Sequence, residues 1–330
     1  MKAVRYHAYG DSDVLVHEDA DRPVAGAGQV VVKVAGTSFN PVDVAIRAGF
    51  LRQVFPLAFP HVPNFDLAGV ITEVGEGVTG WKSGDAVVAF LPMTAPGAAA
   101  EYVAAPADTL AAAPRTGDLA DSAPGTGDLT NAAPRIGDLA DAAALPAAGL
   151  TAWQSLFDHA GLQPGQTILI NGAGGAVGGY AVQLAKQAGA IVTATAGARS
   201  ADRIRRYGAD RIIDYTATSV TQAAGGRFDV VLNLVTTSPE ETASLVGLVT
   251  DGGAFVSTTT PGPEDAGRGV RTVRVFLRSD ATQLAELVTR VDSGELRIDV
   301  ADRRPLADLR AIHDQAAAGR LAGKTILIPA

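Results

Sequence analysis

Cysteine is absent from this chain of 330 residues. Its absence excludes disulfide bonds, a cysteine nucleophile and a thiolate zinc site, and it is compatible with a reducing compartment. The sequence also lacks any apolar run as long as a membrane span, and its first residues, MKAVRYHAYG, become polar too early for a signal peptide. We therefore expect a soluble, cytoplasmic protein that does not use a membrane as a partner.

An excess of positive charge is also missing. The 35 Asp and Glu residues outnumber the 27 Lys and Arg residues, and the net charge is −8, so a nucleic-acid partner is not expected. Hydrophobic residues make up 47% of the chain and charged residues 19%, which is typical of a globular protein. The length is sufficient for two domains, each with its own core.

The most informative stretch is TILINGAGGAVGG, at Thr167–Gly179. An apolar run leads into a glycine-rich turn, and a helical pattern follows. Glycines let the backbone approach a pyrophosphate, and the helix start offers free N–H groups and a positive dipole end. A strict G-x-G-x-x-G is absent, but A-x-G-x-x-G fits on Ala173, Gly175 and Gly178. The pattern predicts a dinucleotide site; the alternative is an ordinary turn between a strand and a helix.

Two patterns divide the rest of the chain. Residues 1 to about 110 contain short strands such as Gln29–Ala35 between turn clusters, which predicts a small barrel-like domain. From Leu145 to about Val275, strands alternate with helices, and their unalternated apolar runs indicate a parallel sheet covered on both faces. Three elements are expected to follow: amphipathic helices at Gln283–Val291 and Leu306–Ala318, and a strand at Lys324–Ile328.

Residues 112–141 form three successive decads, AAPRTGDLAD, SAPGTGDLTN and AAPRIGDLAD. Ten residues are too few for the usual solenoid unit, and three copies bury little surface. We interpret the repeat as a tandem duplication that lengthens one connection. A role in partner binding, or as a lid, is the alternative.

Several stretches together match one known family. They are MKAVRYHAYG, TSFNPVDVAIRAGF, DLAGVITEVGEGVTGWKSGDAVV, AALPAAGLTAWQSLF, LINGAGGAVGGYAVQLAKQAGA, YGADRIIDY, GGAFVS and AGRLAGKTILIP. They span nearly the whole chain, which makes the match far more specific than the glycine turn alone. The chain resembles the zinc-independent medium-chain dehydrogenase/reductases, on the quinone oxidoreductase (zeta-crystallin-like) branch.

The resemblance implies an α/β fold, in which a Rossmann domain with a doubly wound parallel sheet is inserted into a GroES-like, β-barrel-type catalytic domain. The expected parts are a first catalytic segment at 1–111, the decapeptide connection at 112–141, the NADP-binding domain at 142–275 and a returning segment at 276–330. The family normally has one decad at the connection, so two copies look added. The resemblance also implies NADPH in a cleft between the domains, and a homodimer.

Zinc binding is not expected. Zinc-bearing relatives have cysteine and histidine near the positions of Ser38 and of Asn64 and Phe65, and they carry a cysteine-rich loop further on. This chain has no cysteine, and His61 has no partner at ligand spacing. We therefore expect no metal site.

The residues after the second strand of the nucleotide-binding domain favour NADPH over NADH. An NAD-specific domain places an acid about 20 residues beyond the glycines to hold the ribose 2′-hydroxyl. Here no acid precedes Asp202, and Arg199 lies close to the strand end, where it can pair with a 2′-phosphate. A bond of roughly 1.5–3 kcal/mol would give about tenfold to hundredfold preference. Alternatively, Arg199 is a solvated charge like Arg203, Arg205 and Arg206.

The remaining site residues follow mainly from the resemblance. It implies that Asn40 lies near the nicotinamide, that Thr151 packs along the cofactor, and that Lys324 approaches it. Strand-end residues lie at the carboxyl edge of the sheet, where ligands bind, and Tyr215 resembles the family's tyrosine beside the adenosine phosphate. The expected cofactor-binding residues are Asn40, Thr151, Gly174, Gly175, Ala176, Val177, Ala196, Arg199, Ser200, Tyr215, Asn233, Leu234, Val235, Ser257, Thr258 and Lys324.

The catalytic candidates are Asn40 and Asp43. Many relatives carry a tyrosine shortly after the NPxD run, where this chain has Phe50, which cannot donate a proton. Asp43 and Arg47 are polar neighbours, although an Asp–Arg pair four residues apart on a helix is often a structural ion pair. Asn40 in turn could simply cap the helix that begins after it. A quinone can take its proton from water, so no dedicated acid is required.

The sequence therefore predicts an NADPH-dependent reductase that passes a hydride to a quinone or an α,β-unsaturated carbonyl compound. Two alternatives remain open at this point. One is an enoyl reductase dedicated to a single biosynthetic substrate. The other is a non-catalytic NADPH-binding sensor or scaffold that uses the repeat as its contact surface.

Overall fold

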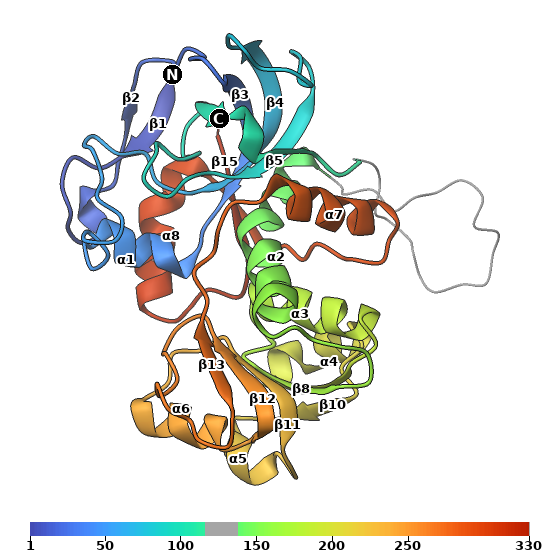
Figure 1. Cartoon of the computed structure of the whole chain (residues 1–330). Helices are drawn as coiled ribbons and strands as arrows, with labels where there is room; N and C mark the ends of the chain where they lie inside the picture. The colour runs from blue at the N-terminus through green and yellow to red at the C-terminus, as the bar shows by residue number, and fades with distance from the viewer. Residues whose placement is uncertain (116–137, 330) are drawn as a thin grey trace. The chain divides into compact units, whose positions relative to one another are not determined.

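The computed structural model describes residues 1–115 and 138–329 (Figure 1). Most of the decad repeat, at 116–137, lies outside the described residues, and so do the expectations about its local structure. The chain divides into two compact units. The first unit comprises Met1–Ala147 and Ser279–Ala330, and the second unit comprises Ala148–Arg278.

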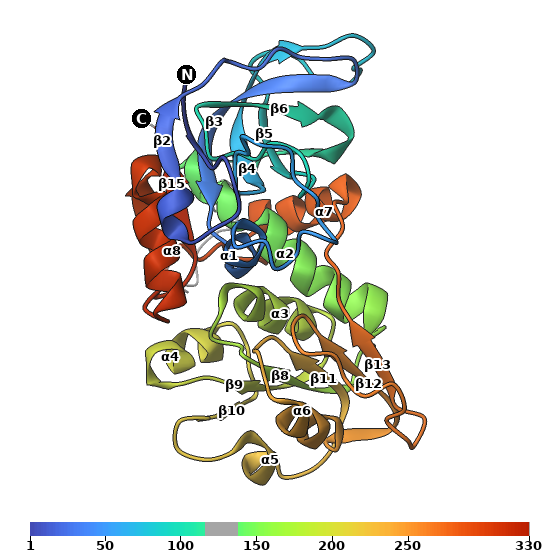
Figure 2. The same ribbon diagram turned by 90° about the vertical axis from the view of Figure 1, so that its left-hand side faces the viewer.

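The second unit contains a parallel sheet with the strand order β10-β9-β8-β11-β12-β13 (Figures 1 and 2). With the strands counted along this unit, the order is 3-2-1-4-5-6, the doubly wound arrangement of a dinucleotide-binding domain. The strands are β8 (Thr167–Asn171), β9 (Ile191–Thr195), β10 (Arg211–Ile213), β11 (Phe228–Asn233), β12 (Val249–Ser257) and β13 (Arg271–Arg274). The helices after them are α3 (Ala176–Gln187), α4 (Ala198–Arg206), α5 (Val220–Ala223) and α6 (Pro239–Val246).

The apolar runs of the sequence explain this sheet. Ile168, Leu169 and Ile170 on β8 are all fully buried, because helices cover both faces of the sheet. The chain then turns sharply at Gly172, where φ is +91°, a conformation that favours glycine. The glycine-rich stretch therefore begins at the carboxyl end of the central strand.

The first unit contains a mainly antiparallel sheet, which has the GroES-like fold expected from the sequence. Its strand order is β14-β15-β3-β4-β5-β7, with β6 also paired to β3, and β1 pairs with β2 separately. The strands are β1 (Lys2–Arg5), β2 (Val16–Asp19), β3 (Gln29–Ser38), β4 (Asp66–Val74), β5 (Ala86–Phe90), β6 (Tyr102–Pro106), β7 (Leu110–Ala112), β14 (Asp302–Pro305) and β15 (Thr325–Ile328).

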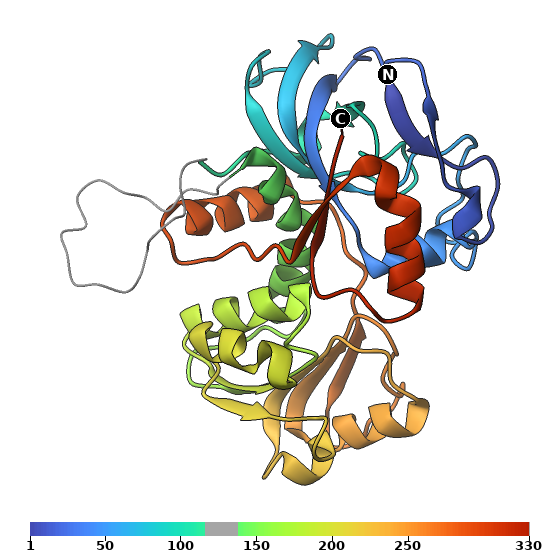
Figure 3. The ribbon, with the colours of Figure 1, turned by 180° about the vertical axis from the view of Figure 1, so that it is seen from behind.

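The C-terminal segment completes this sheet. Strand β15 lies beside β3 (Figure 3). In this pairing, Ile326 is opposite Ser38 and Leu327 is opposite Thr37. This pairing brings the end of the chain to the residues that precede the NPVD run. The helices of the unit are α1 (Pro41–Arg47), α7 (Ala281–Asp292) and α8 (Leu309–Ala317), and α8 packs beside α1.

One helix connects the two units. Helix α2 (Pro146–Trp153) continues as a π-helical turn over Gln154–His159. The sequence predicts a helix only from Thr151, but Pro146 at the first position starts it earlier, since proline is preorganised for a helix N-terminus. In the part of the chain that the structure describes, no helix combines the length and apolar character needed to cross a membrane.

Candidate active site

In the second unit, the glycine turn leads from β8 into α3. Gly175 is the N-cap residue of α3, and no side chain of the described residues caps the helix. The first N–H groups of a helix have no partner within it, and they carry its positive dipole end. Ala176 and Val177, both partly exposed, therefore lie at a helix start that can bind an anion such as a pyrophosphate.

The glycines of this turn have different roles. A Cβ atom at Gly178 would lie 2.5 Å from Ala173 Cα and from the Gly172 carbonyl oxygen, so this position requires glycine for close packing of helix on turn. A Cβ at Gly174 would lie 2.5 Å from Ser200 Oγ. At Gly175 the nearest atom would be 3.5 Å away, and the residue is exposed. Gly175 thus leaves open space at the helix start.

A second uncapped helix start follows the neighbouring strand β9. Ala196 is buried, Gly197 is the N-cap of α4 without a side-chain cap among the described residues, and Arg199 is exposed in the first turn. Tyr215, which is 57% exposed, places its hydroxyl 3.6 Å from the position of a Cβ at Gly197. Arg199 and Tyr215 thus lie near the same helix start, together with Ser200, and no carboxylate occupies the first turn of α4.

The position of Arg203 differs from the one expected from the sequence. As one of several arginines on α4, it was expected to be a solvated charge. Its Nη2 instead donates a hydrogen bond of 2.6 Å to the Gly174 carbonyl oxygen. Arg203 therefore ties α4 to the glycine turn, a long-range contact that the arginine-rich pattern of the helix does not reveal.

A belt of neutral polar side chains crosses the carboxyl ends of the central strands. Asn171 Nδ2 donates to Asn233 Oδ1 (2.9 Å), and Thr195 Oγ1 donates to Asn171 Oδ1 (3.0 Å). Asn233 Nδ2 lies 3.4 Å from Ser257 Oγ. Asn233 and Ser257 are fully buried, so their side chains hold strand ends together. Of the other expected strand-end residues, Leu234 and Thr258 are partly exposed, and Val235 is 38% exposed.

In the first unit, polar side chains converge on Asp66, which has no exposed surface. Its Oδ2 accepts hydrogen bonds from Ser38 Oγ, from Asn40 Nδ2 (2.8 Å) and from Lys324 Nζ (3.1 Å). Its Oδ1 accepts from the backbone N–H of Ala147 at the start of α2 (2.7 Å). We call Ser38, Asn40, Asp66 and Lys324 the Asp66 cluster.

Asn40 and Lys324, two predicted site residues, are therefore in direct contact. Lys324 Nζ lies 2.7 Å from Asn40 Oδ1 and 3.3 Å from the Phe39 carbonyl oxygen. Lys324 is 5% exposed, whereas Asn40 is partly exposed. Asn40 is the N-cap residue of α1 and forms a capping box with Asp43, whose Oδ2 accepts from the Asn40 backbone N–H at 2.7 Å.

Asp43 is 2% exposed, and its Oδ1 is buried without a hydrogen-bond partner among the described residues. Burial raises the pKa of Asp43 to about 7. No ion pair joins it to Arg47, whose Nε and Nη1 are likewise buried without partners in the described chain. The predicted alternative of an Asp43–Arg47 ion pair is therefore not formed. Burial also lowers the pKa of His61 to about 4 and that of His313 to about 3.

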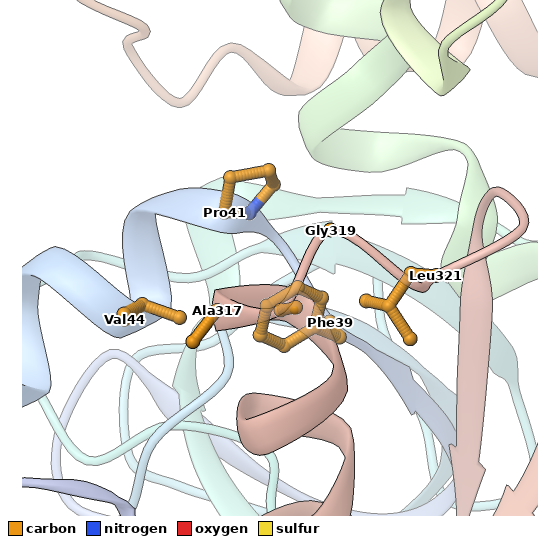
Figure 4. Close-up of a pocket in the computed structure, with 7 residues that line it drawn as sticks. Phe39, Pro41, Val44, Ala317, Gly319 and Leu321 are labelled. Carbon is orange, nitrogen blue, oxygen red and sulfur yellow. The ribbon is translucent and has the colours of Figure 1, made fainter.

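The first unit has an apolar pocket of about 360 Å³, whose lining includes Phe39 and Pro41, the sequence neighbours of Asn40 (Figure 4). Pro41 and Val44 come from α1, Ala317 from the end of α8, and Phe39 directly precedes Asn40. The full lining is Phe39, Pro41, Val44, Ala316, Ala317, Gly319 and Leu321. Phe50, in contrast, is 82% exposed.

Among the described residues, no group of three or more His, Cys, Asp or Glu side chains is placed to hold a metal ion. At the positions where zinc-bearing relatives have ligands, Ser38 donates to Asp66 and Asn64 Nδ2 donates to the Ser38 carbonyl oxygen (3.0 Å). The positive charge at this point is the Lys324 ammonium group.

The sequence identified Asn40 and Lys324 but not Asp66 as a shared partner. Asp66 and Lys324 are separated by 258 positions, and only the β3–β15 pairing brings them together. The glycine turn, Arg199, Ser200 and Tyr215 lie together in the second unit, and Thr151 lies on α2. The cofactor roles of these residues stay predictions.

Comparison with known proteins identifies the family. Residues 26–115 match the alcohol dehydrogenase GroES-like domain, and residues 207–327 match the zinc-binding dehydrogenase family. The chloroplast envelope quinone oxidoreductase homolog of Arabidopsis thaliana is 34% identical, with 100% of this chain and 98% of that protein covered. The NADPH-dependent alkenal/one oxidoreductase of the same plant is 31% identical, over 92% of this chain and 73% of that protein.

A solved structure agrees with these relatives. The quinone oxidoreductase of Coxiella burnetii superposes with a TM-score of 0.82 at 27% identity, over 99% of both chains. The chain therefore belongs to the medium-chain dehydrogenase/reductase family of oxidoreductases, on its quinone oxidoreductase-like branch. The resemblance noted in the sequence is confirmed, and so is the fold class.

Proposed function

We propose that this protein is an NADPH-dependent reductase of quinones or α,β-unsaturated carbonyl compounds. The observation that carries the proposal is the pair of uncapped helix starts after β8 and β9, the second of which has Arg199 and no acid in its first turn. The relatives named as a quinone oxidoreductase homolog and an alkenal/one oxidoreductase support the same acceptor classes.

The residues of the second unit fit a dinucleotide phosphate. The α3 start at Gly175–Val177 would bind the pyrophosphate, with Gly175 leaving room for it. Arg199, Ser200 and Tyr215 would hold the 2′-phosphate end. When bound, NADPH supplies the hydride. The buried side chains of Asn233 and Ser257 would shape the sheet edge rather than touch the cofactor, while Leu234, Val235 and Thr258 are open to it.

The first unit would position the acceptor. Asn40 is the partly exposed member of the Asp66 cluster, and the apolar pocket beside it would take an apolar part of the acceptor. Asp43 is too deeply buried to protonate an acceptor directly, and Phe50 has no proton to give. Reduction of a quinone or an enone needs one proton with the hydride, and water can supply it.

Zinc independence is part of the proposal. The Asp66 carboxylate is already neutralised by Lys324 and satisfied by four donors, so it has no need of a metal ion. An activity that persists after dialysis against a chelator is expected. Activity that is lost with the chelator and restored by zinc would refute this part.

The test is oxidation of NADPH, followed at 340 nm, with a panel of quinones and enones. Turnover with at least one acceptor is expected, and slower turnover with NADH. If NADPH binds tightly but no acceptor is reduced, the protein is a sensor or scaffold. Deleting two of the three decads is an independent test, because an enzyme should keep its turnover whereas a scaffold should lose its partner.

We further propose a homodimer in the cytoplasm. Strand β13 is an edge strand of the second unit's sheet, and Phe276 just beyond it is 61% exposed, so this edge could pair with a second copy. Light scattering after size exclusion would show twice the chain mass of 33.6 kDa if this is correct. Cell fractionation tests the compartment.

A further inference from the structure

The orientation of the Asn40 side-chain amide is determined by its two charged neighbours. Lys324 can only donate hydrogen bonds, and the Asp66 carboxylate can only accept them. The 2.7 Å contact with Lys324 Nζ therefore assigns Oδ1, and the 2.8 Å contact with Asp66 assigns Nδ2. A flipped amide would place its NH₂ group against the Lys324 ammonium group and its oxygen against the Asp66 carboxylate. Neither contact could then be a hydrogen bond, so the assignment has no alternative.

This orientation leaves one Nδ2 hydrogen of Asn40 unused. An amide nitrogen carries two hydrogens, and Asp66 accepts one of them. The second has no acceptor within the described residues, and Asn40 is partly exposed while the rest of the cluster is buried. The Lys324 ammonium group at Oδ1 and the Asp66 carboxylate at the first Nδ2 hydrogen also polarise the amide. Asn40 is thus a preoriented hydrogen-bond donor.

Lys324 itself has no donor left for a ligand. Its ammonium group has three hydrogens, and Phe39 O, Asn40 Oδ1 and Asp66 Oδ2 accept them. Asp66 is equally occupied, because its carboxylate accepts from the side chains of Ser38, Asn40 and Lys324 and from the backbone N–H of Ala147. Neither residue is available to contact a substrate, and both act on Asn40.

We infer that Asp66 and Lys324 are positioning residues that hold Asn40 as a donor to a carbonyl oxygen. This inference rests on the proposed function and deepens it. The oxygen belongs either to the carboxamide of the nicotinamide or to the acceptor, where negative charge develops as the hydride arrives. In both cases, the free Nδ2 hydrogen is the group that binds.

A mutant cycle between Asp66 and Asn40 tests this. Asp66→Asn should lower kcat at least tenfold, and Asn40→Ala should do the same. If Asp66 acts through Asn40, the double variant should have the kcat of Asn40→Ala to within about twofold. Independent roles would instead multiply the two losses, and that outcome overturns the inference.

Two further variants separate positioning from folding. Asp66→Asn combined with Lys324→Met leaves no unpaired buried charge, so it should fold even if Asp66→Asn alone does not. The kcat of this double variant should remain at least tenfold below that of the wild type. Recovery to within twofold of wild type would refute the positioning role of Asp66 and Lys324. Asp141→Asn breaks another ion pair of the same unit, in which the buried Asp141 lies 2.7 Å from the half-exposed Arg303. It should leave kcat within twofold, and an equal loss there would also overturn the inference.

Titration of NADPH fluorescence distinguishes the two oxygens. If Asn40 binds the carboxamide, Asn40→Ala and Asp66→Asn should weaken NADPH binding together by at least fivefold. If it binds the acceptor, the affinity for NADPH should stay unchanged while kcat falls. No change in either quantity refutes the inference. A wild-type protein that binds NADPH but reduces no acceptor would refute the proposed function alone. The NADPH affinities of the variants could still be measured and would still test whether Asn40 binds the carboxamide.

Discussion

The two units differ in the charge of their buried polar networks. Each has a buried polar network at the edge of its sheet, next to candidate site residues. In the first unit the network is charged, with Asp66 and Lys324 at 0% and 5% exposure. In the second unit, Asn171, Thr195 and Asn233 are all neutral. Under the proposed function, the neutral network would lie beside a negatively charged pyrophosphate, and the charged network would lie beside the acceptor.

A pyrophosphate carries negative charge, and a carboxylate beside the glycine turn would repel it. A neutral belt holds the strand ends together without opposing the positive dipole ends of α3 and α4. In the first unit, the carboxylate of Asp66 is neutralised by Lys324 in contact with it. There the charges can orient Asn40 more strongly than neutral groups would.

The largest expected effect comes from breaking the charged network. Lys324→Met leaves Asp66 buried without its counter-ion, and this should lower the free energy of unfolding by about 3–5 kcal/mol. Asn233→Ala in the neutral belt leaves neutral groups unsatisfied and should cost about 1–3 kcal/mol. Urea unfolding monitored by tryptophan fluorescence measures both, since Trp81 lies in the first unit and Trp153 in the second.

Arg205→Met is the control for this comparison, because its ion pair with Asp202 is exposed. It should cost less than about 1 kcal/mol. Equal losses for Lys324→Met and Asn233→Ala would mean that the charge of the first network does not matter.

The second prediction concerns pH. Asp43 has a folded-state pKa of about 7, against an ordinary value of 3.8. Between about pH 4 and pH 7 the unfolded chain loses this proton while the folded protein keeps it, so stability falls as pH rises through this window. Asp43→Asn removes the effect and should gain about 2–3 kcal/mol relative to wild type between pH 5 and pH 8.

The comparison between variant and wild type is essential here. The depressed pKa values of His61 and His313 act in the opposite direction, since stability from a neutral buried histidine is lost as pH falls below about 6.5. Both proteins share these histidines, so their contribution cancels in the difference. Identical pH profiles of the melting temperature in the two proteins would show that Asp43 is ionised when folded.

The third prediction separates packing from binding in the glycine turn. Gly178→Ala would bring Cβ within 2.5 Å of backbone atoms, so it should lower stability by about 1–3 kcal/mol and weaken NADPH binding as well. Gly175→Ala has open space and should keep the melting temperature within a few degrees, yet still weaken NADPH binding. Unchanged NADPH affinity in Gly175→Ala would move the pyrophosphate away from this helix start.

The fourth prediction concerns cofactor choice. Arg199→Ala should reduce the preference for NADPH over NADH by about tenfold to hundredfold, since it removes a charge-assisted bond to the 2′-phosphate. Arg206→Ala, an exposed arginine at the other end of α4, is the matched control and should have no such effect. The ratio of kcat/KM for the two cofactors measures both. Equal ratios in all three proteins would place the 2′-phosphate elsewhere.

The smallest expected effect is at the apolar pocket. Ala317→Phe should fill it and lower kcat/KM on the order of tenfold for acceptors with an apolar tail, but not for small acceptors. Ala311→Phe, on the exposed part of the same helix, is the control. A weaker affinity for NADPH in Ala317→Phe would instead assign the pocket to the cofactor.

The sequence by itself determined the local features of this protein. Unalternated apolar runs predicted the parallel sheet, and the register on Ala173, Gly175 and Gly178 located the glycine turn between β8 and α3. These signals are local, because strand, turn and helix are contiguous in the chain. The missing acid after β9 is equally readable from a few residues. Together with the resemblance, they were sufficient for the fold class and the family.

Only the tertiary structure decided which polar groups meet. Asp66 became a shared partner because β15 brings Lys324 to it across most of the chain. Asp43 and Arg47 share a helix but form no ion pair, and Arg203 donates to the Gly174 carbonyl oxygen of the glycine turn. Helical spacing and charge cannot predict such contacts, since burial and the direction of each side chain depend on elements that are distant in sequence.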